Sequence, residues 1–498
     1  MVGCTVGYEF LRELLKLSAF PCARPARIAS VTKVIQSPDY LEVPASVAPA
    51  SQIPLDHVLF ALKHEGINLQ VLAQSLPQIP ADQIIETFRR SPASKYIRIA
   101  AYLWEQFCGS ELEGLPVAVG PYVNLFDERR YITGNRIRNT KWRVDFNGLG
   151  NMAYCPTVER TNVITELLEK NTLQRAQEFI SGLDLELLDR TMSWSYLSET
   201  ESSFAIEREN PSSSKAEAFA ELLKQARDTK PITEAYLVQL QNMTVTNPMD
   251  HDMQFRHRVN WLRGPGRGVL GITYVPPMPD LIPEIMDSIM DLLNHPPLNV
   301  SPIIIGALTS FAFVFAHPFT DGNGRLSRFI FHKALCKSKI LAQGLVLPIS
   351  IAMKRNESNY LQALKSFSVP ARRLWDISMI DDENFELNFK GDSSIYRYWD
   401  ATQCVEFGLQ MAQQALELDL YNETIYLKNY DYIYKKIINT IDINNNDLSL
   451  MVRFCLQNEG LISINKRKKF LANGYKEEII NTVETIATSA IKGGTAAL

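Results

Sequence analysis

An uncharged segment that runs from Asn299 to Thr320 places the strongest constraint on how this chain can fold. Its central part, Val300 to Ala316, is mostly apolar and approaches the length of a membrane-spanning helix. Pro302, Gly306 and several hydroxyl-bearing residues dilute the segment, and it stands alone in the chain. We therefore predict a helix buried at the centre of a globular domain, and no contact with a membrane.

The length and composition indicate a soluble protein of several folding units. At roughly 150 residues per domain, the 498 residues allow about three units. With 46% hydrophobic and 21% charged residues, the chain is neither collagen-like nor disordered. The formal net charge of -4 creates no overall field that would attract nucleic acid or anionic lipid, so any such contact must be local.

The cysteines and the N-terminus indicate a cytoplasmic protein. Glu9 and Glu13 interrupt the apolar core that a secretory signal requires. The cysteines are odd in number and show no short paired spacing, which argues against a disulfide framework or a zinc site. They are Cys4, Cys22, Cys108, Cys155, Cys336, Cys404 and Cys455. A reducing compartment suits them best.

The spacing of apolar residues predicts a mainly α protein with a small β-rich segment. Helical periodicity runs from residue 55 to 108 and returns at residue 161. Between them, short β-rich pieces are predicted at Tyr122 to Phe126, Tyr131 to Thr133 and Trp142 to Phe146. We predict four regions: an N-terminal helical region at 1–115, a small β-rich region at 116–160, a helical core at 161–375, and a C-terminal module at 376–498.

Within the core, a hairpin should precede a set of packed helices. Gly264 to Gly268 cannot lie inside a helix, and Val269 to Val275 after it has the composition of a short strand. Start signals and periodicity predict helices at 161–199, 212–228, 233–243, 281–293, 302–315, 325–338 and 359–367.

A loop that opens a helix carries the main chemical signal. The segment from His317 to Arg328 reads His-Pro-Phe-Thr-Asp-Gly-Asn-Gly-Arg-Leu-Ser-Arg. Gly322, Asn323 and Gly324 would leave backbone N–H groups open at a helix start, where the helix dipole favours a phosphate. Arg325 and Arg328 are three residues apart, so both guanidinium groups can hold further phosphate oxygens. We predict a polyphosphate-binding cradle.

Two more side chains complete this site. Asp321 is a hard oxygen ligand beside the cradle, and it suits Mg²⁺ shared between one carboxylate and phosphates. A substrate with a triphosphate group is therefore expected. His317 is the histidine of this cluster, and an imidazole is the natural base for a proton on an attacking hydroxyl. Phe319, between them, should anchor the loop in the apolar core.

These residues resemble the motif of the Fic (Fic/Doc) family, His-x-Phe-x-(Asp or Glu)-Gly-Asn-Gly-Arg-x-x-Arg, at every specified position. The resemblance implies a Fic-type helical bundle and an adenylyltransferase that moves AMP from ATP onto a Ser, Thr or Tyr hydroxyl of a target protein. By this resemblance His317 is the base, Asp321 holds Mg²⁺, and Asn323 with the glycine N–H groups steadies the α-phosphate. The two arginines take the outer phosphates.

Two flanking segments are similar to other parts of the family. Arg256 to Gly264, followed by Gly271, Ile272, Thr273, Tyr274 and Val275, looks like the approach to the β-hairpin flap, whose edge could pair with an extended target segment. An ordinary surface hairpin is the alternative. Asn356 to Leu364 resembles the segment that lines the adenine side, with Tyr360 as the candidate neighbour, although a helical aromatic is more often core.

Ser203 to Glu207 resembles the family's inhibitory helix, (Ser or Thr)-x-x-x-Glu-(Gly or Asn), except that Arg208 stands at the last position. The resemblance implies that Glu207 pairs with Arg328 and so blocks productive ATP binding. The same glutamate could instead serve removal of AMP from modified targets. A solvated acidic helix face is the plain alternative.

The C-terminal module suggests a winged helix. Predicted helices at 430–441 and 447–458 are followed by a predicted strand at 460–464 and a basic turn at Lys466 to Lys469. Such a turn could contact DNA, but docking of a partner protein or of a second copy of the chain is the preferred role. A nucleotide-sensing or DNA-binding regulator with a weakly active core, and transfer of another nucleotide, therefore remain alternatives to the enzyme.

Overall fold

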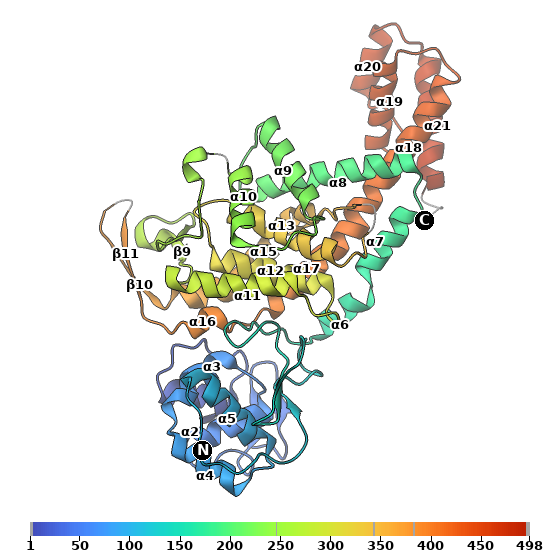
Figure 1. The fold of residues 1–498 in the computed structure, drawn as a ribbon. Helices are drawn as coiled ribbons and strands as arrows, with labels where there is room; N and C mark the ends of the chain where they lie inside the picture. The colour runs from blue at the N-terminus through green and yellow to red at the C-terminus, as the bar shows by residue number, and fades with distance from the viewer. Residues whose placement is uncertain (1–2, 246, 342–343, 382–383, 495–498) are drawn as a thin grey trace. The chain divides into compact units, whose positions relative to one another are not determined.

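The computed structural model describes residues 3–245, 247–341, 344–381 and 384–494, and it is mainly helical, as predicted. Figure 1 shows the order of the elements along the chain. The chain divides into two compact units, each built from three segments. The first unit comprises residues 1–170, 211–338 and 356–410, and the second comprises residues 171–210, 339–355 and 411–498. The predicted division into four regions stays a prediction, and its outer ends at 1–2 and 495–498 lie outside the described residues.

The first 110 residues form the helices predicted between residues 55 and 108, together with one further helix, α1, and a small sheet that were not predicted. The helices are α1 (Gly7–Leu14), α2 (Pro54–His64), α3 (Leu69–Ser75), α4 (Ala81–Arg90) and α5 (Lys95–Cys108). The sheet has the order β1-β2-β4-β3, from β1 (Thr5–Val6), β2 (Ala26–Ala29), β3 (Ile35–Gln36) and β4 (Leu41–Pro44). Each strand has two to four residues, which is too short for a visible alternating pattern.

The predicted β-rich region contains a three-stranded sheet. Its order is β5-β7-β6, from β5 (Val123–Asn124), β6 (Ile137–Asn139) and β7 (Val144–Phe146). The strands predicted at 122–126 and 142–146 are confirmed. The strand predicted at 131–133 is wrong, because Tyr131 makes only a single bridge to Glu159 and the third strand lies further along the chain.

The helical core of the first unit is built around α12 (Pro302–Ala316), in which all residues except Pro302 and Val314 are buried. The predicted central helix is thus confirmed. Gly306 permits close packing on the next helix, because a Cβ at this position would lie 3.1 Å from the carbonyl oxygen of Phe331. Within the described part of the chain, no helix is long and apolar enough to cross a bilayer.

The other core elements agree with the predicted order. The hairpin β8 (Leu262–Arg263) and β9 (Ile272–Tyr274) is antiparallel and interrupted by a bulge. The helices are α6 (Asn162–Glu169), α9 (Ser213–Gln225), α10 (Glu234–Thr244), α11 (Ile282–Asn294), α13 (Asn323–Lys337), α15 (Glu357–Arg372), α16 (Ser394–Arg397) and α17 (Thr402–Gln414). A second hairpin, β10 (Trp375–Met379) and β11 (Phe385–Phe389), was not predicted, and its Trp375 and Phe385 pack with Ile272 and Val275.

The described residues of the second unit form helices joined by loops, with no strand among them. The unit contains α7 (Thr172–Ser181), α8 (Leu185–Ile206), α14 (Ile349–Arg355), a π-helical turn (Ala415–Leu420), α18 (Tyr421–Ile438), α19 (Asn445–Gln457), α20 (Ile464–Ala472) and α21 (Glu477–Gly494). Apolar residues of α18, α19 and α21, such as Ile433, Val452 and Val483, share one core.

The winged-helix prediction is not confirmed. The strand expected at 460–464 is absent from the described structure, and the basic run Lys466 to Lys469 lies on helix α20 rather than on a turn. Two of its charges are used inside the module. Arg467 pairs with Glu484 at 2.7 Å, and the Lys466 ammonium lies 3.5 Å from the centre of the Phe454 ring.

Helix α8 ends in a turn with a left-handed backbone conformation, which glycine usually adopts in proteins. The N–H of Glu209 donates to the carbonyl of Phe204 at 3.1 Å, and the N–H of Arg208 donates to that of Ala205 at 3.1 Å. This pair of bonds is a Schellman motif, which requires a left-handed residue just after the helix. Arg208 occupies that position with φ of 60°. The position where the family pattern has Gly or Asn is therefore the one where those residues cost least.

We predict that Arg208→Gly is more stable than Arg208→Ala by about 1 kcal/mol. Both substitutions remove the arginine side chain, but only glycine relieves the steric cost of the left-handed backbone. Denaturant unfolding followed by circular dichroism measures the difference. Equal stability of the two variants would contradict the assignment of this turn.

Candidate active site

The candidate site lies where the chain reverses between α12 and α13. Helix α12 ends at His317, which has φ of 48°, and α13 begins after Gly322, which has φ of 83°. Two left-handed residues thus start and end a short loop. The structure brings together all residues predicted for the cradle, from His317 through Arg328, on this loop and the first turns of α13.

Asn323 holds the loop in shape from inside. Its side chain is 2% exposed, accepts a hydrogen bond from the N–H of Phe319 at 3.1 Å, and donates one to the carbonyl of Phe319 at 2.8 Å. Phe319 is fully buried against Phe255 and Phe313, which confirms that it anchors the loop. The contact of Asn323 with an α-phosphate stays a prediction.

Two residues from outside the motif support the loop from α10 and the segment after it. Asp252 accepts hydrogen bonds from the N–H and the hydroxyl of Thr320, at 2.8 Å and 3.0 Å. Gln241 donates to the carbonyl of Asp321 at 3.2 Å. Nothing in the local sequence pattern identifies these two residues, because they lie some 70 to 80 positions upstream.

The first turn of α13 has no side-chain cap from its N-cap residue, Gly322. Gly322 caps the helix without a side-chain hydrogen bond, and a Cβ there would lie 3.2 Å from a methyl group of Val245. Glycine is therefore required both by the backbone angle and by the space. The N–H groups at a helix start that lack a side-chain cap can receive phosphate oxygens.

Both cradle arginines are buried, each 1% exposed. Arg325 donates to the carbonyl of Thr244 at 3.0 Å and lies 3.1 Å from the carboxylate of Asp321. It therefore orients the acidic side chain as well as adding positive charge. The binding of phosphates by Arg325 and Arg328 stays a prediction.

Asp321 is chemically suited to Mg²⁺. Its side chain is 43% exposed, and Oδ1 accepts the N–H of Gly322 at 2.6 Å, while Oδ2 contacts Arg325. A carboxylate oxygen has further lone pairs, so a metal can still coordinate. Because the described residues include no group of three metal-ligating side chains, such a metal would need phosphate and water oxygens as its other ligands, which is usual for Mg²⁺.

His317 is a neutral imidazole at pH 7. Burial, and next the nearby positive charge of Arg256, lower its pKa to about 4, although the carbonyl of Val314 and the carboxylate of Asp321 oppose the shift. A histidine that is unprotonated at neutral pH can accept a proton. The structure thus provides the protonation state that a base needs.

Arg256 holds together the end of α12 and the end of the flap hairpin. Its guanidinium donates to the carbonyls of His317 at 2.8 Å, Pro277 at 2.6 Å and Arg258 at 3.0 Å, and its N–H donates to Pro318 at 2.7 Å. Burial lowers its pKa to about 10, so it remains charged. The sequence analysis included Arg256 in the approach to the flap but assigned it no role.

We predict that Arg256→Met lowers the free energy of unfolding by about 3 kcal/mol, because several buried carbonyls lose their donor. Urea unfolding measures this change. The matched control is Arg258→Met two residues away: this side chain is exposed, and its replacement should change stability by less than about 0.5 kcal/mol. Similar losses in both variants would contradict the role of Arg256.

The flap hairpin is fastened to the end of α12. Ile272, Tyr274 and Val275 are buried, and Thr273 is exposed. The hydroxyl of Tyr274 donates to the carbonyl of Phe315 at 2.7 Å, and the N–H of Gly264 donates to the carbonyl of Gly271 at 2.8 Å. Docking of a target segment on this hairpin stays a prediction.

The remaining predicted site residues belong to other elements than the loop and α13. Tyr360 is packed in the aromatic core, with ring centres 5.8 Å from Phe311 and 5.6 Å from Phe407, and its place beside an adenine stays a prediction. Ser203 is buried in α8, and Glu207 is exposed at the end of that helix, in the second unit. The contact between Glu207 and Arg328 also stays a prediction.

Comparison with known proteins shows which family the region around this loop is similar to. The sequence profile of the Fic/DOC family matches residues 231–335, which include α10 to α13 and the flap hairpin. This chain contains a Fic/DOC family domain.

Two sequence relatives of the Fic domain are named protein adenylyltransferases. The chain is 38% identical over 66 residues to a protein of Nematostella vectensis named protein adenylyltransferase Fic, and 35% identical over 66 residues to protein adenylyltransferase fic-1 of Caenorhabditis elegans. Each match covers 13% of this chain, and 16% and 13% of the two relatives. A Fic family protein of Desulfovibrio desulfuricans aligns in structure over 64% of this chain and 90% of its own, with 18% identity and a TM-score of 0.40.

Proposed function

We propose that this protein is an adenylyltransferase that transfers AMP from ATP to a Ser, Thr or Tyr hydroxyl of a target protein. The observation that carries the proposal is the geometry of one loop: a neutral imidazole at His317, a carboxylate at Asp321 and the open start of α13 follow one another within a few residues. The names of the sequence relatives agree with this reaction.

In the proposed step, the oxygen of the target hydroxyl attacks the α-phosphorus of ATP. The new bond joins that oxygen to the α-phosphorus, the bond from the α-phosphorus to the bridging oxygen of the β-phosphate breaks, and pyrophosphate leaves. The hydroxyl proton passes to the imidazole of His317. Such a base contributes about 10² to 10⁴ in rate.

The chain's own groups position the reactants and stabilise charge. The N–H groups at the start of α13 and the guanidinium groups of Arg325 and Arg328 would hold the phosphates, and these groups are already fixed by the surrounding fold. Asp321 would hold Mg²⁺, which when bound neutralises part of the phosphate charge. The flap hairpin would hold the target segment, with exposed Thr273 on its outer side.

We further propose that Glu207 restrains the reaction. A glutamate that pairs with Arg328 would occupy the cation needed by the outer phosphates, so ATP would bind in an unproductive way.

We also propose that the protein is cytoplasmic, because its scattered free cysteines agree with a reducing compartment.

Intact-mass spectrometry after incubation with ATP and Mg²⁺ tests the reaction. We predict a gain of one AMP mass on the protein itself, a larger gain for Glu207→Gly, and a rate about 10² to 10⁴-fold lower for His317→Ala. The controls are Glu201→Gly, on the same helix, and His295→Ala, an exposed histidine. Labelling that persists in His317→Ala would overturn the proposed base, and equal labelling of the parent and Glu207→Gly would overturn the restraint.

We also predict that nucleotide binding raises the pKa of His317. The free protein should show a value of about 4, since burial and Arg256 both disfavour the imidazolium, so the ring stays neutral down to low pH. Bound phosphates add negative charge nearby and favour the protonated form. NMR titration of labelled histidine, assigned with His317→Gln, measures both values, with a non-hydrolysable ATP analogue as ligand. A free-protein pKa near 6.5 would contradict the predicted electrostatics.

A further inference from the structure

The flap and the segment that leads into it carry a strongly positive local charge. From residue 253 to residue 279 the chain has four arginines, Arg256, Arg258, Arg263 and Arg267, and neither an aspartate nor a glutamate. The whole chain, in contrast, has a formal net charge of -4. Arg256 is buried, whereas the other three are exposed. We call Arg258, Arg263 and Arg267 the flap arginines.

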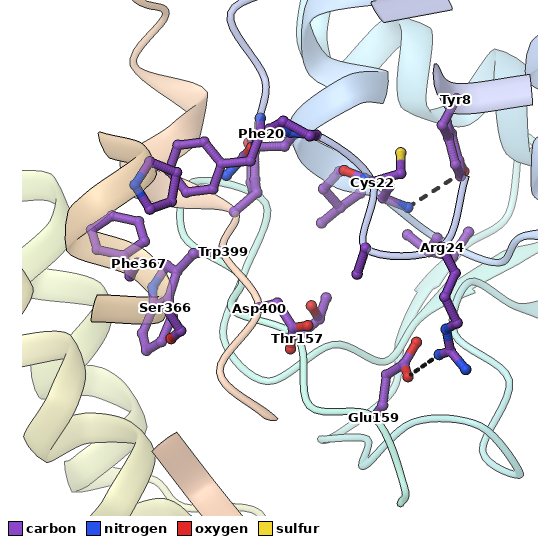
Figure 2. A pocket seen from close by; sticks show the side chains of 18 of the residues that line it. Tyr8, Phe20, Cys22, Arg24, Thr157, Glu159, Ser366, Phe367, Trp399 and Asp400 are labelled. Atoms are coloured by element: carbon purple, nitrogen blue, oxygen red, sulfur yellow. Dashed lines mark hydrogen bonds and ion pairs between the residues drawn. The ribbon is translucent and has the colours of Figure 1, made fainter. Parts of the chain in front are cut away.

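Within the described residues, none of the flap arginines makes an ion pair. Arg263 instead lies over the ring of Phe385, with its guanidinium carbon 5.2 Å from the ring centre. Arginines elsewhere in the same unit are neutralised. In a cavity of about 500 Å³, Arg24 and Arg130 each lie 3.1 Å from the carboxylate of Glu159, and Figure 2 shows the pair of Arg24 and Glu159. The flap arginines therefore keep their charge available to a partner, whereas those of the cavity do not.

The hairpin β10–β11 packs against the flap but turns its carboxylates away from it. Ile377 of β10 lies in the apolar core that this hairpin shares with the flap. Asp376 and Glu386 alternate with residues of that core and are exposed. Because successive side chains of a strand point to opposite faces, both carboxylates lie on the face away from the flap. Asp381, at the turn of the hairpin, accepts the N–H of Asn384 at 2.8 Å.

The positively charged segment begins beside the reacting loop. The guanidinium of Arg256 donates to the carbonyls of both His317 and Arg258, at 2.8 Å and 3.0 Å. The side-chain amide of Asn260 donates to the carbonyl of Phe319 at 3.5 Å. Residues 256–260 therefore run along the loop, and the backbone of Arg258 lies within the reach of one guanidinium group from the proposed base.

The other two flap arginines continue along the hairpin to its turn. Arg263 belongs to β8, and Arg267 lies in the connection to β9, which is closed by the hydrogen bond from the N–H of Gly264 to the carbonyl of Gly271 at 2.8 Å. Leu270, in the same connection, is 91% exposed. From the reacting loop to the turn of the flap, the surface thus offers three guanidinium groups and one apolar side chain.

We propose that the flap arginines select an extended acidic segment of the target protein, with carboxylates near the hydroxyl that receives AMP. This inference rests on the proposed function, because the acceptor hydroxyl would lie in that segment. An extended peptide advances about 3.3 Å per residue, so carboxylates within a few residues of the hydroxyl lie along the hairpin. Guanidinium groups bind carboxylates through paired, charge-assisted hydrogen bonds. Leu270 adds an apolar contact at the turn.

A nucleic acid is the competing partner for a strip of arginines, because phosphates bind the same groups. The position of the strip favours a peptide. It lies on a hairpin, whose edge can pair with an extended segment, and the negative net charge of the chain opposes a polyanion as long as a nucleic acid.

Fluorescence anisotropy with the full chain, in the absence of ATP, tests the proposal. The probe is a labelled nine-residue peptide with a central threonine and glutamates at alternate positions, and matched peptides carry glutamine or lysine instead. At low salt the glutamate peptide should bind about tenfold or more tightly than the glutamine peptide, and the lysine peptide should bind most weakly. Equal affinity for glutamate and glutamine, or binding of no peptide, would overturn the proposal.

Substitutions then locate the binding surface. The double variant Arg263→Gln and Arg267→Gln should weaken binding of the glutamate peptide by about fivefold or more and leave the glutamine peptide unchanged. The matched control is Arg129→Gln with Arg453→Gln, which removes the same charge from two exposed arginines that also make no ion pair within the described residues. It should change the affinity by less than about twofold. Equal losses in the two double variants would contradict a role of the flap.

A single-stranded oligothymidylate with the same charge as the glutamate peptide separates the two partners. It should bind more weakly than the peptide. Tighter binding that disappears in the Arg263→Gln and Arg267→Gln variant would overturn the choice of an acidic protein segment. Because these measurements use no ATP, the two proposals can fail separately. Peptide binding without AMP transfer would contradict only the reaction, and AMP transfer without preference for the glutamate peptide would contradict only the acidic target.

Discussion

The capping of one helix end determines the rest of the candidate site. Helix α12 is buried, so the carbonyl groups at its C-terminus cannot turn to water and need donors from the protein. Tyr274 of the flap supplies one to Phe315, and Arg256 supplies others to Ala316 and to His317, which follows the helix. At the other side of the same loop, α13 begins without a side-chain cap. The loop thus joins a helix end whose carbonyls receive donors from the flap and from Arg256 to a helix start whose N–H groups can accept an anion.

The same capping residue also sets the chemistry of His317. Burial disfavours the protonated imidazole most, and the charged guanidinium of Arg256 nearby acts in the same direction. Arg256 therefore bonds to the backbone of the proposed base and adds to the effect that lowers its pKa. A pKa of about 4 also makes a weak base, so bound phosphates would have to raise it for proton transfer to be efficient. The negative charge of the bound substrate would then raise the pKa of His317, which the protein alone holds too low for efficient proton transfer.

Sequence reasoning located the reacting loop but not its supports. Helices α10 to α13 could be predicted because their start signals and periodicity are local, and the loop because its residues are consecutive. Asp252, Gln241 and Arg256 could not, because a supporting hydrogen bond leaves no spacing pattern in the sequence.

The strand predictions that failed also have physical causes. Alternation of Leu461, Ile462, Ser463 and Ile464 imitates a strand, but the N–H of Ile462 donates to the side chain of Glu484 and a helix follows at once. The strands of the N-terminal sheet have two to four residues and fall below the length at which alternation can be recognised. Arg208 shows the opposite case, in which the backbone geometry is present without its sequence signal. The residue has a left-handed backbone, although the sequence has neither Gly nor Asn at this position.

The N-terminal residues and the Fic domain share a single aromatic core. Phe367 of α15 packs on Phe315, with ring centres 4.5 Å apart, and Phe315 is two residues before His317. The same ring packs on Phe20 and Trp399, with ring centres 5.7 Å away in each case. Removal of the first 160 residues would therefore uncover Trp399 and one side of Phe367, as well as breaking the backbone hydrogen bonds of Thr157 with Trp399 and Ala401. The N-terminal residues are therefore structural parts of the compact unit that carries His317, joined to α12 through closely packed rings.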